Sequence, residues 1–170
     1  LVVVDEAYGE FTDAPSAVSL LDDRDDVAIL RTFSKAYGLA GLRLGYAIVP
    51  ATWADAYAKV NTPFAASAVA CTAGLAALDD EDHVEETVET VQWSRAYMRE
   101  NVEARTYESH GNFVLVEVGD ASAVAETLKR RGVIVRDCSS FGLPEHLRIT
   151  CGTRRETKRA VSELNEVLAE

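Results

Sequence analysis

The sequence of 170 residues lacks long apolar runs and an excess of basic residues, and both shortages exclude kinds of partner. No stretch approaches the ~20 consecutive apolar residues that a membrane-spanning helix needs, so we expect no membrane partner. Lysine and arginine together number 17 against 28 aspartates and glutamates, which gives a net charge of −11. Because binding to nucleic acid requires a basic face that neutralises phosphates, we expect no nucleic-acid partner.

Cysteine is scarce as well. The three cysteines form no C-x-x-C pair and are Cys71, Cys138 and Cys151. Such a scattered, odd set is typical of reduced thiols in a reducing compartment, so we expect a cytoplasmic protein. The three histidines have no metal-ligand spacing among themselves or with the cysteines, and the sequence predicts no metal site.

Short β-branched runs predict strands over 1–4, 27–33 and 45–50. The first run is apolar throughout, as in a buried parallel strand. Ligands of open α/β sheets bind at the carboxyl ends of the strands. Asp5 and the Ser34–Lys35 pair both follow strands directly, so we expect them to share a site.

The rest of the chain predicts helices over 52–60, 67–78, 122–132, from 82 and from 154, and strands over 112–118, 133–137 and 146–150. This order predicts an α/β portion with a mostly parallel sheet over residues 1–79, followed by a small α+β domain over 80–170. The chain begins LVVVDEAY, without Met and inside an apolar run, so we expect a fragment of a longer protein.

The stretch TFSKAYGLAGLRLGY at 32–46 places one of only four lysines among small residues and glycines. A lysine that forms a Schiff base must lose its proton, which an enclosed site beside other cations favours. Arg43 offers a planar guanidinium suited to phosphate. Thr32 and Ser34 add hydroxyl donors, and the glycines allow backbone to approach a ligand closely.

Asp5 and Tyr8, which precede this stretch in the chain, offer two further groups that a ligand could use. Asp5, at a strand end, could hold a ring nitrogen protonated through a charge-assisted hydrogen bond of about 2.7–2.9 Å. Tyr8 could donate to a phenolic oxygen. An imine-forming amine, a partner for a pyridinium, a phenol donor and a phosphate site are what a pyridoxal phosphate enzyme needs. Taken alone, the S-K dipeptide is also typical of a surface lysine in a glycine-containing loop.

The string T-F-S-K-A-Y-G-L-A-G resembles the lysine attachment motif of the fold-type I, class I/II aminotransferases, and G-x-R-x-G at 41–45 and V-V-D-E-A-Y at 3–8 fit it. The resemblance implies pyridoxal 5'-phosphate as cofactor. Lys35 would carry it and move the substrate proton, Asp5 would hold the pyridinium, and Tyr8 would bind the phenolic oxygen. The implied phosphate ligands are Thr32, Ser34 and Arg43.

Within this family, GVIVRDCSSFGLPEHLRITCGTRRET resembles the histidinol-phosphate aminotransferases, of which the chain would be the C-terminal half. The resemblance implies that Arg148 binds the anionic end of the substrate and Arg136 its phosphate. The implied reaction moves an amino group from L-glutamate to imidazole acetol phosphate, which gives L-histidinol phosphate and 2-oxoglutarate. The family also implies a homodimer whose active site takes residues from both subunits.

Three alternatives stay open at this point. A threonine-phosphate decarboxylase shares the lysine segment and an R-D-C-S-like string, although T-C-G-T after Arg148 favours the aminotransferase. Another class I/II amino-acid aminotransferase would show the same cofactor residues. The third alternative is a different kind of protein, a catalytically incomplete piece. In this half of the family's sequence, part of the phosphate site and the residue that stacks on the cofactor ring are missing.

Overall fold

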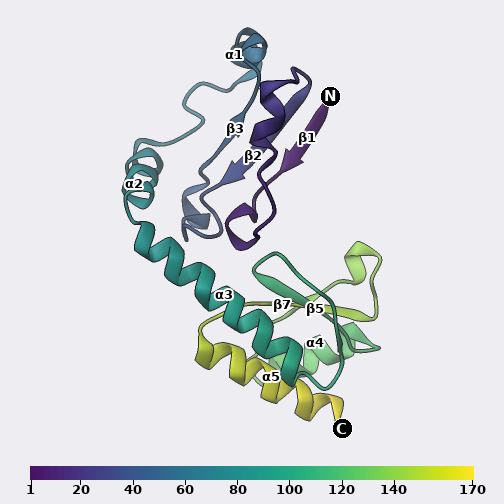
Figure 1. Ribbon diagram of the computed structural model, residues 1–170. Coiled ribbons are helices and arrows are strands. Elements are labelled where there is room, and N and C mark those ends of the chain that lie inside the picture. The colour runs from purple at the N-terminus through teal and green to yellow at the C-terminus, as the bar shows by residue number, and fades with distance from the viewer. The chain divides into compact units, whose positions relative to one another are not determined.

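The computed structural model describes residues 1–170, which form two compact units, Leu1–Glu86 and Thr87–Glu170 (Figure 1). No helix is both long and apolar enough to cross a lipid bilayer. The boundary expected between residues 79 and 80 concerns the domains of a larger protein and stays a prediction.

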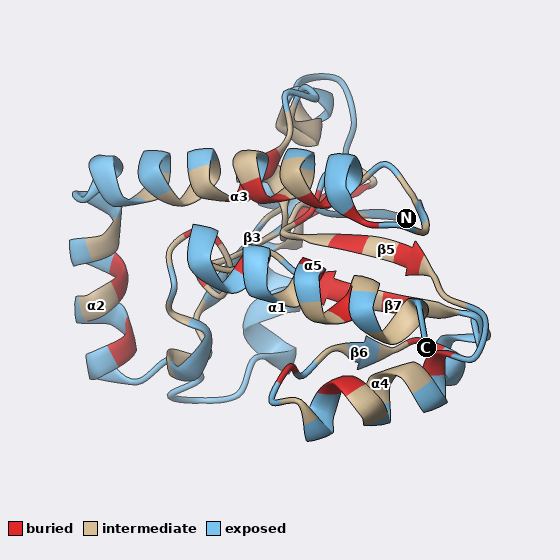
Figure 2. Ribbon diagram, turned by 90° about the horizontal axis from the view of Figure 1, so that it is seen from below, coloured by how far each residue is buried: buried red, intermediate tan, exposed pale blue.

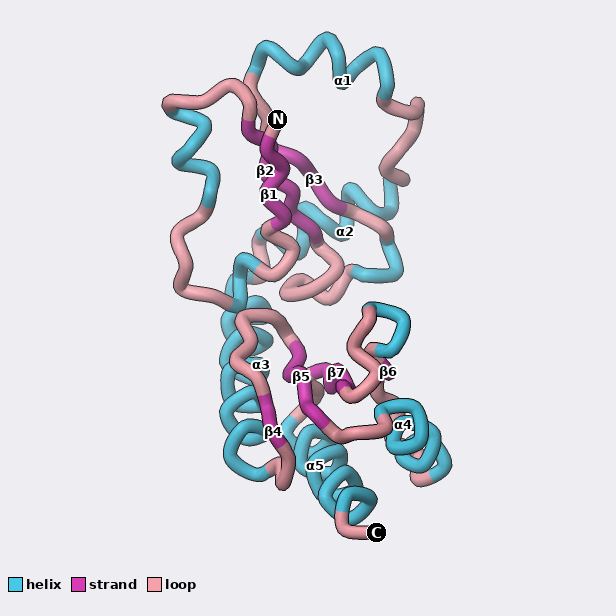
Figure 3. The backbone as a smooth tube through the Cα atoms, turned by 90° about the vertical axis from the view of Figure 1, so that its right-hand side faces the viewer, coloured by secondary structure: helices cyan, strands magenta, loops and turns pink.

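The first unit contains a three-stranded sheet with the order β1 (Val2–Asp5), β2 (Val27–Thr32) and β3 (Gly45–Ile48) (Figure 3). β1 runs parallel to β2, whereas β3 runs antiparallel to it. The sequence predicted a mostly parallel sheet. Only the 3-10 helix Ala40–Leu42 lies between β2 and β3, and parallel pairing requires a longer crossover, usually a full helix.

The core of this unit lies under β2, where Val27 and Ile29 are fully buried. The prediction that the first run is a buried strand is wrong for this chain, because the side chains of Val2 and Val3 are 43% and 54% exposed. β1 is an edge strand with β2 as its one neighbour, so it has the apolar composition of a buried strand although its side chains are exposed.

The helices of the first unit are α1 (Ala54–Val60), α2 (Ala68–Leu78) and the start of α3 (Glu81–Asn101), with 3-10 helices at Gly9–Phe11, Ala17–Asp22 and Ala51–Trp53. α2 begins after Ser67, whose hydroxyl accepts a hydrogen bond from the Ala70 N–H at 3.1 Å. A Cβ on Gly74 would collide with Leu44, so this glycine permits the close packing of α2.

The second unit contains an antiparallel sheet with the order β4 (Arg105–Thr106), β5 (Phe113–Glu117), β7 (His146–Thr150) and β6 (Arg136–Asp137), together with α4 (Ala121–Arg130), α5 (Arg154–Leu168) and the 3-10 helix Ser139–Phe141. Alternate residues of β5 and β7 face one core (Figure 2). They pack with Met98 of α3, Leu128 of α4 and Leu164 of α5. The opposite face therefore carries the remaining side chains of these strands.

Local signals explain where the helices of this unit begin and end. Thr153 and Glu156 form a capping box at the start of α5. Gly132, with a φ of +78°, follows the end of α4 in the left-handed region. The strand predicted over 133–137 shortens to Arg136–Asp137, because only these two residues pair with β7.

Candidate active site

The carboxyl ends of β1 and β2 form a pocket of about 300 Å³. Its lining includes five of the six residues predicted to bind the cofactor, namely Asp5, Thr32, Ser34, Lys35 and Arg43. The sixth, Tyr8, does not line the pocket, but its ring centroid lies 5.2 Å from the Lys35 Nζ. The parallel pairing of β1 with β2 explains the gathering, because it brings residues 5 and 32–35 to one edge of the sheet.

Lys35 lies in the loop that follows β2, and its neighbours fix that loop. Phe33 and Ala36 are buried, whereas Lys35 is half-buried. The Lys35 carbonyl accepts a hydrogen bond from the Gly38 N–H at 3.0 Å, and Gly38 adopts a φ of +69°. None of the ion pairs of the chain includes Lys35. The Lys35 amine thus lies at the pocket without a salt bridge to a carboxylate.

The groups predicted to bind phosphate lie on both sides of the lysine. Thr32 Oγ1 accepts a hydrogen bond from the Ser34 N–H at 3.0 Å. Arg43 is left-handed, with φ 54° and ψ 46°, and its Nη1 donates to the Ala40 carbonyl at 2.8 Å. A non-glycine residue in this conformation costs about 1–3 kcal/mol, and such strain clusters at ligand sites. The backbone therefore holds Arg43 at the pocket at some cost in stability.

Asp5 and Glu6 make different contacts. The Asp5 Oδ1 accepts a hydrogen bond from the Ala7 N–H at 2.9 Å. The Glu6 carboxylate accepts from Arg31 at 2.7 and 3.1 Å, from Ser16 Oγ at 2.9 and 3.0 Å, and from the Ala17 N–H at 2.6 Å. Burial alone would raise the pKa of Glu6, but these hydrogen bonds and the Arg31 charge together lower it.

The Glu6–Arg31 pair was not singled out in the sequence. Each residue follows one of the directly paired residues Asp5 and Leu30, and strand alternation therefore turns both side chains to the face opposite Asp5. The parallel register of β1 and β2 could have revealed this pair from the sequence, because it places Glu6 beside Arg31.

Arg136 and Arg148, the predicted substrate ligands, lie directly opposite each other on β6 and β7. The Arg148 Nε is buried and has no hydrogen-bond partner. Neither residue takes part in any ion pair of the chain. Two guanidinium groups on paired residues, neither in a salt bridge, suit an anionic ligand.

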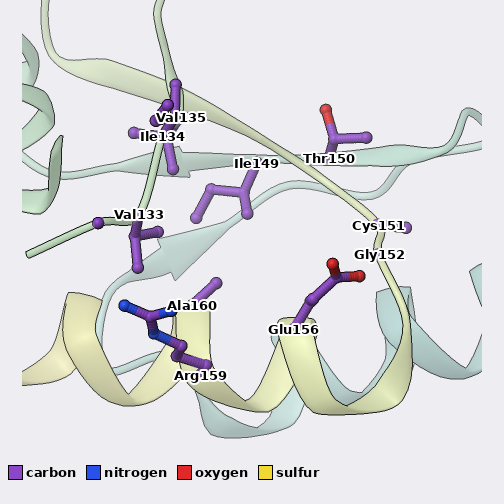
Figure 4. A pocket seen from close by; sticks show the side chains of 11 residues that line it. Val133, Ile134, Val135, Ile149, Thr150, Cys151, Gly152, Glu156, Arg159 and Ala160 are labelled. Carbon is purple, nitrogen blue, oxygen red and sulfur yellow. The ribbon is translucent and has the colours of Figure 1, made fainter.

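A second pocket, of about 340 Å³, lies in the Thr87–Glu170 unit between the 132–135 segment, the end of β7 and α5 (Figure 4). Its charged side chains already have partners, because Glu156 caps α5 and Arg159 donates to the Arg131 carbonyl at 2.9 Å. Burial raises the pKa of the Cys151 thiol to about 11, so the thiol stays neutral. This pocket has no group prepared for acid–base or nucleophilic chemistry.

The sequence model of the family "Aminotransferase class I and II" matches residues 1–164. The chain belongs to this family. Among its aminotransferase relatives, the histidinol-phosphate aminotransferase of Haloarcula marismortui is 69% identical over 170 residues, which cover all of this chain and 47% of the relative. That of Natronomonas pharaonis is 70% identical over 168 residues, with 99% and 47% covered.

A solved structure agrees with the sequence relatives. Histidinol-phosphate aminotransferase from Sinorhizobium meliloti, in complex with pyridoxal-5'-phosphate, matches with a TM-score of 0.89 and 34% identity. The match covers 99% of this chain and 49% of that chain. The chain therefore has the fold of the matched half of this aminotransferase structure, and it spans about half the length of the curated relatives it matches.

Proposed function

We propose that this chain forms part of a pyridoxal 5'-phosphate-dependent histidinol-phosphate aminotransferase. The enzyme would transfer the amino group of L-glutamate to imidazole acetol phosphate and release 2-oxoglutarate and L-histidinol phosphate. The observation that carries the proposal is the single pocket lined by Asp5, Lys35 and Arg43 in a chain 69% identical to an aminotransferase of that name.

The donor set of the pocket fits the cofactor. A half-buried amine without an acid partner, an acid at a strand end, two hydroxyls and a guanidinium match the aldehyde, ring nitrogen and phosphate of pyridoxal phosphate. When bound, the cofactor supplies an electron sink for negative charge at the substrate α-carbon. The residues that would hold it are Asp5, Tyr8, Thr32, Ser34, Lys35 and Arg43.

Each of these groups has its own task. The Lys35 Nζ would hold the cofactor and carry a proton to and from the substrate α-carbon, which requires an amine not locked in an ion pair. The Asp5 carboxylate would accept the ring N–H and keep that nitrogen protonated. Tyr8 would donate its hydroxyl to the phenolic oxygen, and Thr32, Ser34 and Arg43 would bind the phosphate.

Arg148 and Arg136 would bind the anionic ends of the two substrates. A bidentate guanidinium fits both a carboxylate and a phosphate oxygen pair, as an enzyme with two different anionic substrates requires. The unpartnered Nε of Arg148 supports this assignment, because a buried donor without an acceptor costs free energy that a bound anion would recover.

Exposed apolar residues support assembly with further protein. In the first unit Phe64 is 99% exposed and Val69 68% exposed, and Val60 and Leu75 are exposed as well. Large exposed apolar side chains that gather in one unit mark protein–protein contact surfaces. This unit would therefore contact other parts of the enzyme, and the family resemblance implies that the working enzyme is a homodimer.

The decisive test is trapping at Lys35. The chain, alone and within the complete enzyme, is mixed with pyridoxal phosphate and reduced with borohydride, and the labelled peptide is identified by mass spectrometry. We expect the label on Lys35, its loss in Lys35→Ala, and no change in Lys59→Ala, which alters an exposed lysine of α1.

Amino transfer is then measured as 2-oxoglutarate released from L-glutamate. A label at another lysine would refute the cofactor assignment. A label on Lys35 with release of carbon dioxide from a phosphorylated amino acid would favour the decarboxylase. Labelling without turnover by the chain alone, but with turnover by the complete enzyme, would show that this piece is catalytically incomplete.

A further inference from the structure

The open face of the second sheet holds two positive charges directly opposite each other. Arg136 and Arg148 are Cα partners on β6 and β7, and their side chains leave the sheet on the same face. Like charges at such positions destabilise a sheet. No acid of the chain pairs with either group. Something other than an ion pair must therefore hold the two guanidinium groups in place.

Each guanidinium lies over an aromatic ring. The Cζ of Arg148 is 5.2 Å from the centroid of Phe113, and the Cζ of Arg136 is 5.3 Å from the centroid of Phe141. Both distances fall within the range of cation–π attraction. Phe113 lies diagonally across from Arg148, since it pairs with Thr150 on the same strand. Each arginine is thus drawn toward its own ring.

Local contacts fix the Phe113 ring and the turn that carries Phe141. A Cβ on Gly111 would approach the Phe113 ring to 2.8 Å, so the ring packs directly on that backbone. Phe141 ends a 3-10 turn that Asp137 anchors, because the Asp137 carboxylate accepts from the Ser139 N–H at 2.8 Å and from Ser122 Oγ at 2.6 Å. The Phe141 N–H donates to the Cys138 carbonyl at 2.9 Å.

Phe141 is nevertheless 59% exposed. On this turn the ring of Phe141 lies beside the guanidinium of Arg136.

We propose that Phe113 and Phe141 are positioning residues that hold Arg148 and Arg136 as a clamp for a dianion, and that Phe141 sets the preference for phosphate over carboxylate. This inference rests on the proposed function of the two arginines. One bidentate arginine satisfies the two oxygens of a carboxylate, whereas a phosphate has a third oxygen for a second arginine. Loss of the Phe141 ring therefore weakens phosphate binding and leaves carboxylate binding to Arg148 nearly unchanged.

The test follows the guanidinium Nε–H resonances of Arg136 and Arg148 by NMR, assigned with Arg136→Lys and Arg148→Lys. This readout separates the clamp from the cofactor phosphate site, which would bind the same probe. The chain is titrated with inorganic phosphate at mildly alkaline pH and, in parallel, with acetate. The variants are Phe141→Leu, Phe141→Trp and the matched control Leu143→Ala, which alters an apolar residue of the same loop.

We expect Phe141→Leu to weaken phosphate binding roughly two- to fivefold, the range of an exposed cation–π contact, with little change for acetate. Phe141→Trp should retain the phosphate affinity of the unaltered chain, and so should Leu143→Ala. Unchanged phosphate affinity in Phe141→Leu, equal losses for both anions, or a Phe141→Trp as weak as Phe141→Leu would overturn the inference. If phosphate moves neither resonance in the unaltered chain, the substrate site itself is wrong, whereas the Lys35 labelling stands or fails separately.

Discussion

The guanidinium of Arg31 donates two hydrogen bonds to the Glu6 carboxylate, at 2.7 and 3.1 Å, and thereby joins the end of β1 to β2. Glu6 directly follows Asp5, so the same contacts fix the backbone that carries the Asp5 carboxylate. The pair is also well shielded, because the Glu6 side chain is only 11% exposed. The position of Asp5 in the candidate active site thus depends on the ion pair between Glu6 and Arg31, and Arg31 itself contributes to the pocket lining.

Removal of this carboxylate should destabilise the chain. We expect Glu6→Ala to lower the free energy of unfolding by about 2–4 kcal/mol, because it removes the ion-pair partner of Arg31 and the acceptor of the Ser16 hydroxyl and the Ala17 N–H. Glu6→Gln should cost less, since its amide oxygen still accepts from the Ala17 N–H. Urea unfolding at neutral pH measures both. The control Asp26→Asn breaks an exposed pair with Arg24 and should change stability by less than about 1 kcal/mol.

The same pair predicts a pH dependence. The pKa of Glu6 in the folded chain lies below its ordinary value of 4.5. The stabilisation is therefore complete above pH 4.5 and is lost as the pH falls through the folded pKa. Unfolding measured from neutral pH down to the acid range should show a shallower loss of stability for Glu6→Gln than for the unaltered chain. Parallel pH profiles of the two proteins would contradict this prediction.

Arg148 and Arg136 should differ in their effect on catalysis. In the complete enzyme, Arg148→Ala should lower kcat/KM for both substrates by about 10- to 100-fold, the worth of hydrogen bonds to a charged group. Arg136→Ala should act mainly on the phosphorylated substrate. Steady-state kinetics with each substrate varied in turn measures both effects. Arg24→Ala, which removes an exposed arginine, serves as the control, and an Arg148→Ala enzyme with normal kinetics would refute the assignment.

Two glycines of the G-x-R-x-G motif should respond differently to alanine. A Cβ on Gly45 would meet the Arg31 carbonyl oxygen at 2.8 Å, whereas a Cβ on Gly41 would meet nothing within 4 Å. We therefore expect Gly45→Ala to cost about 1–3 kcal/mol of stability and Gly41→Ala to change it by less than about 0.5 kcal/mol. Urea unfolding measures the stability of both variants. Equal effects would mean that β2 and β3 can shift to accommodate the added Cβ.

The acidic surface should make the chain sensitive to salt. With a net charge of −11, mutual repulsion destabilises the compact state, and salt screens it over a Debye length of about 10 Å at 0.1 M and about 3 Å at 1 M. The melting temperature should rise with sodium chloride across this range. Replacing Asp22 and Asp23 with lysine should flatten the dependence, while a melting temperature independent of salt would show that the repulsion is too weak to matter.

Much of the fold followed from the sequence because its signals are local. The β-branched run at 27–33, the alanine-rich stretch at 67–78 and the periodicity from Arg154 each specify an element through neighbouring residues, and each element is present. The antiparallel direction of β3 and the exposure of Val2 were not predicted, because pairing and cover depend on contacts between distant segments.

The candidate site divides in the same way. The residues around Lys35 could be named from the sequence, because their chemistry and spacing are carried by short motifs. Asp5 and Lys35 were expected to share a site because both follow strands, and they line one pocket. The pairing of Glu6 with Arg31 and the placement of Arg136 opposite Arg148 were decided only by strand register. Register joins residues far apart in the chain, and no local preference encodes it; the tertiary structure alone placed these groups side by side.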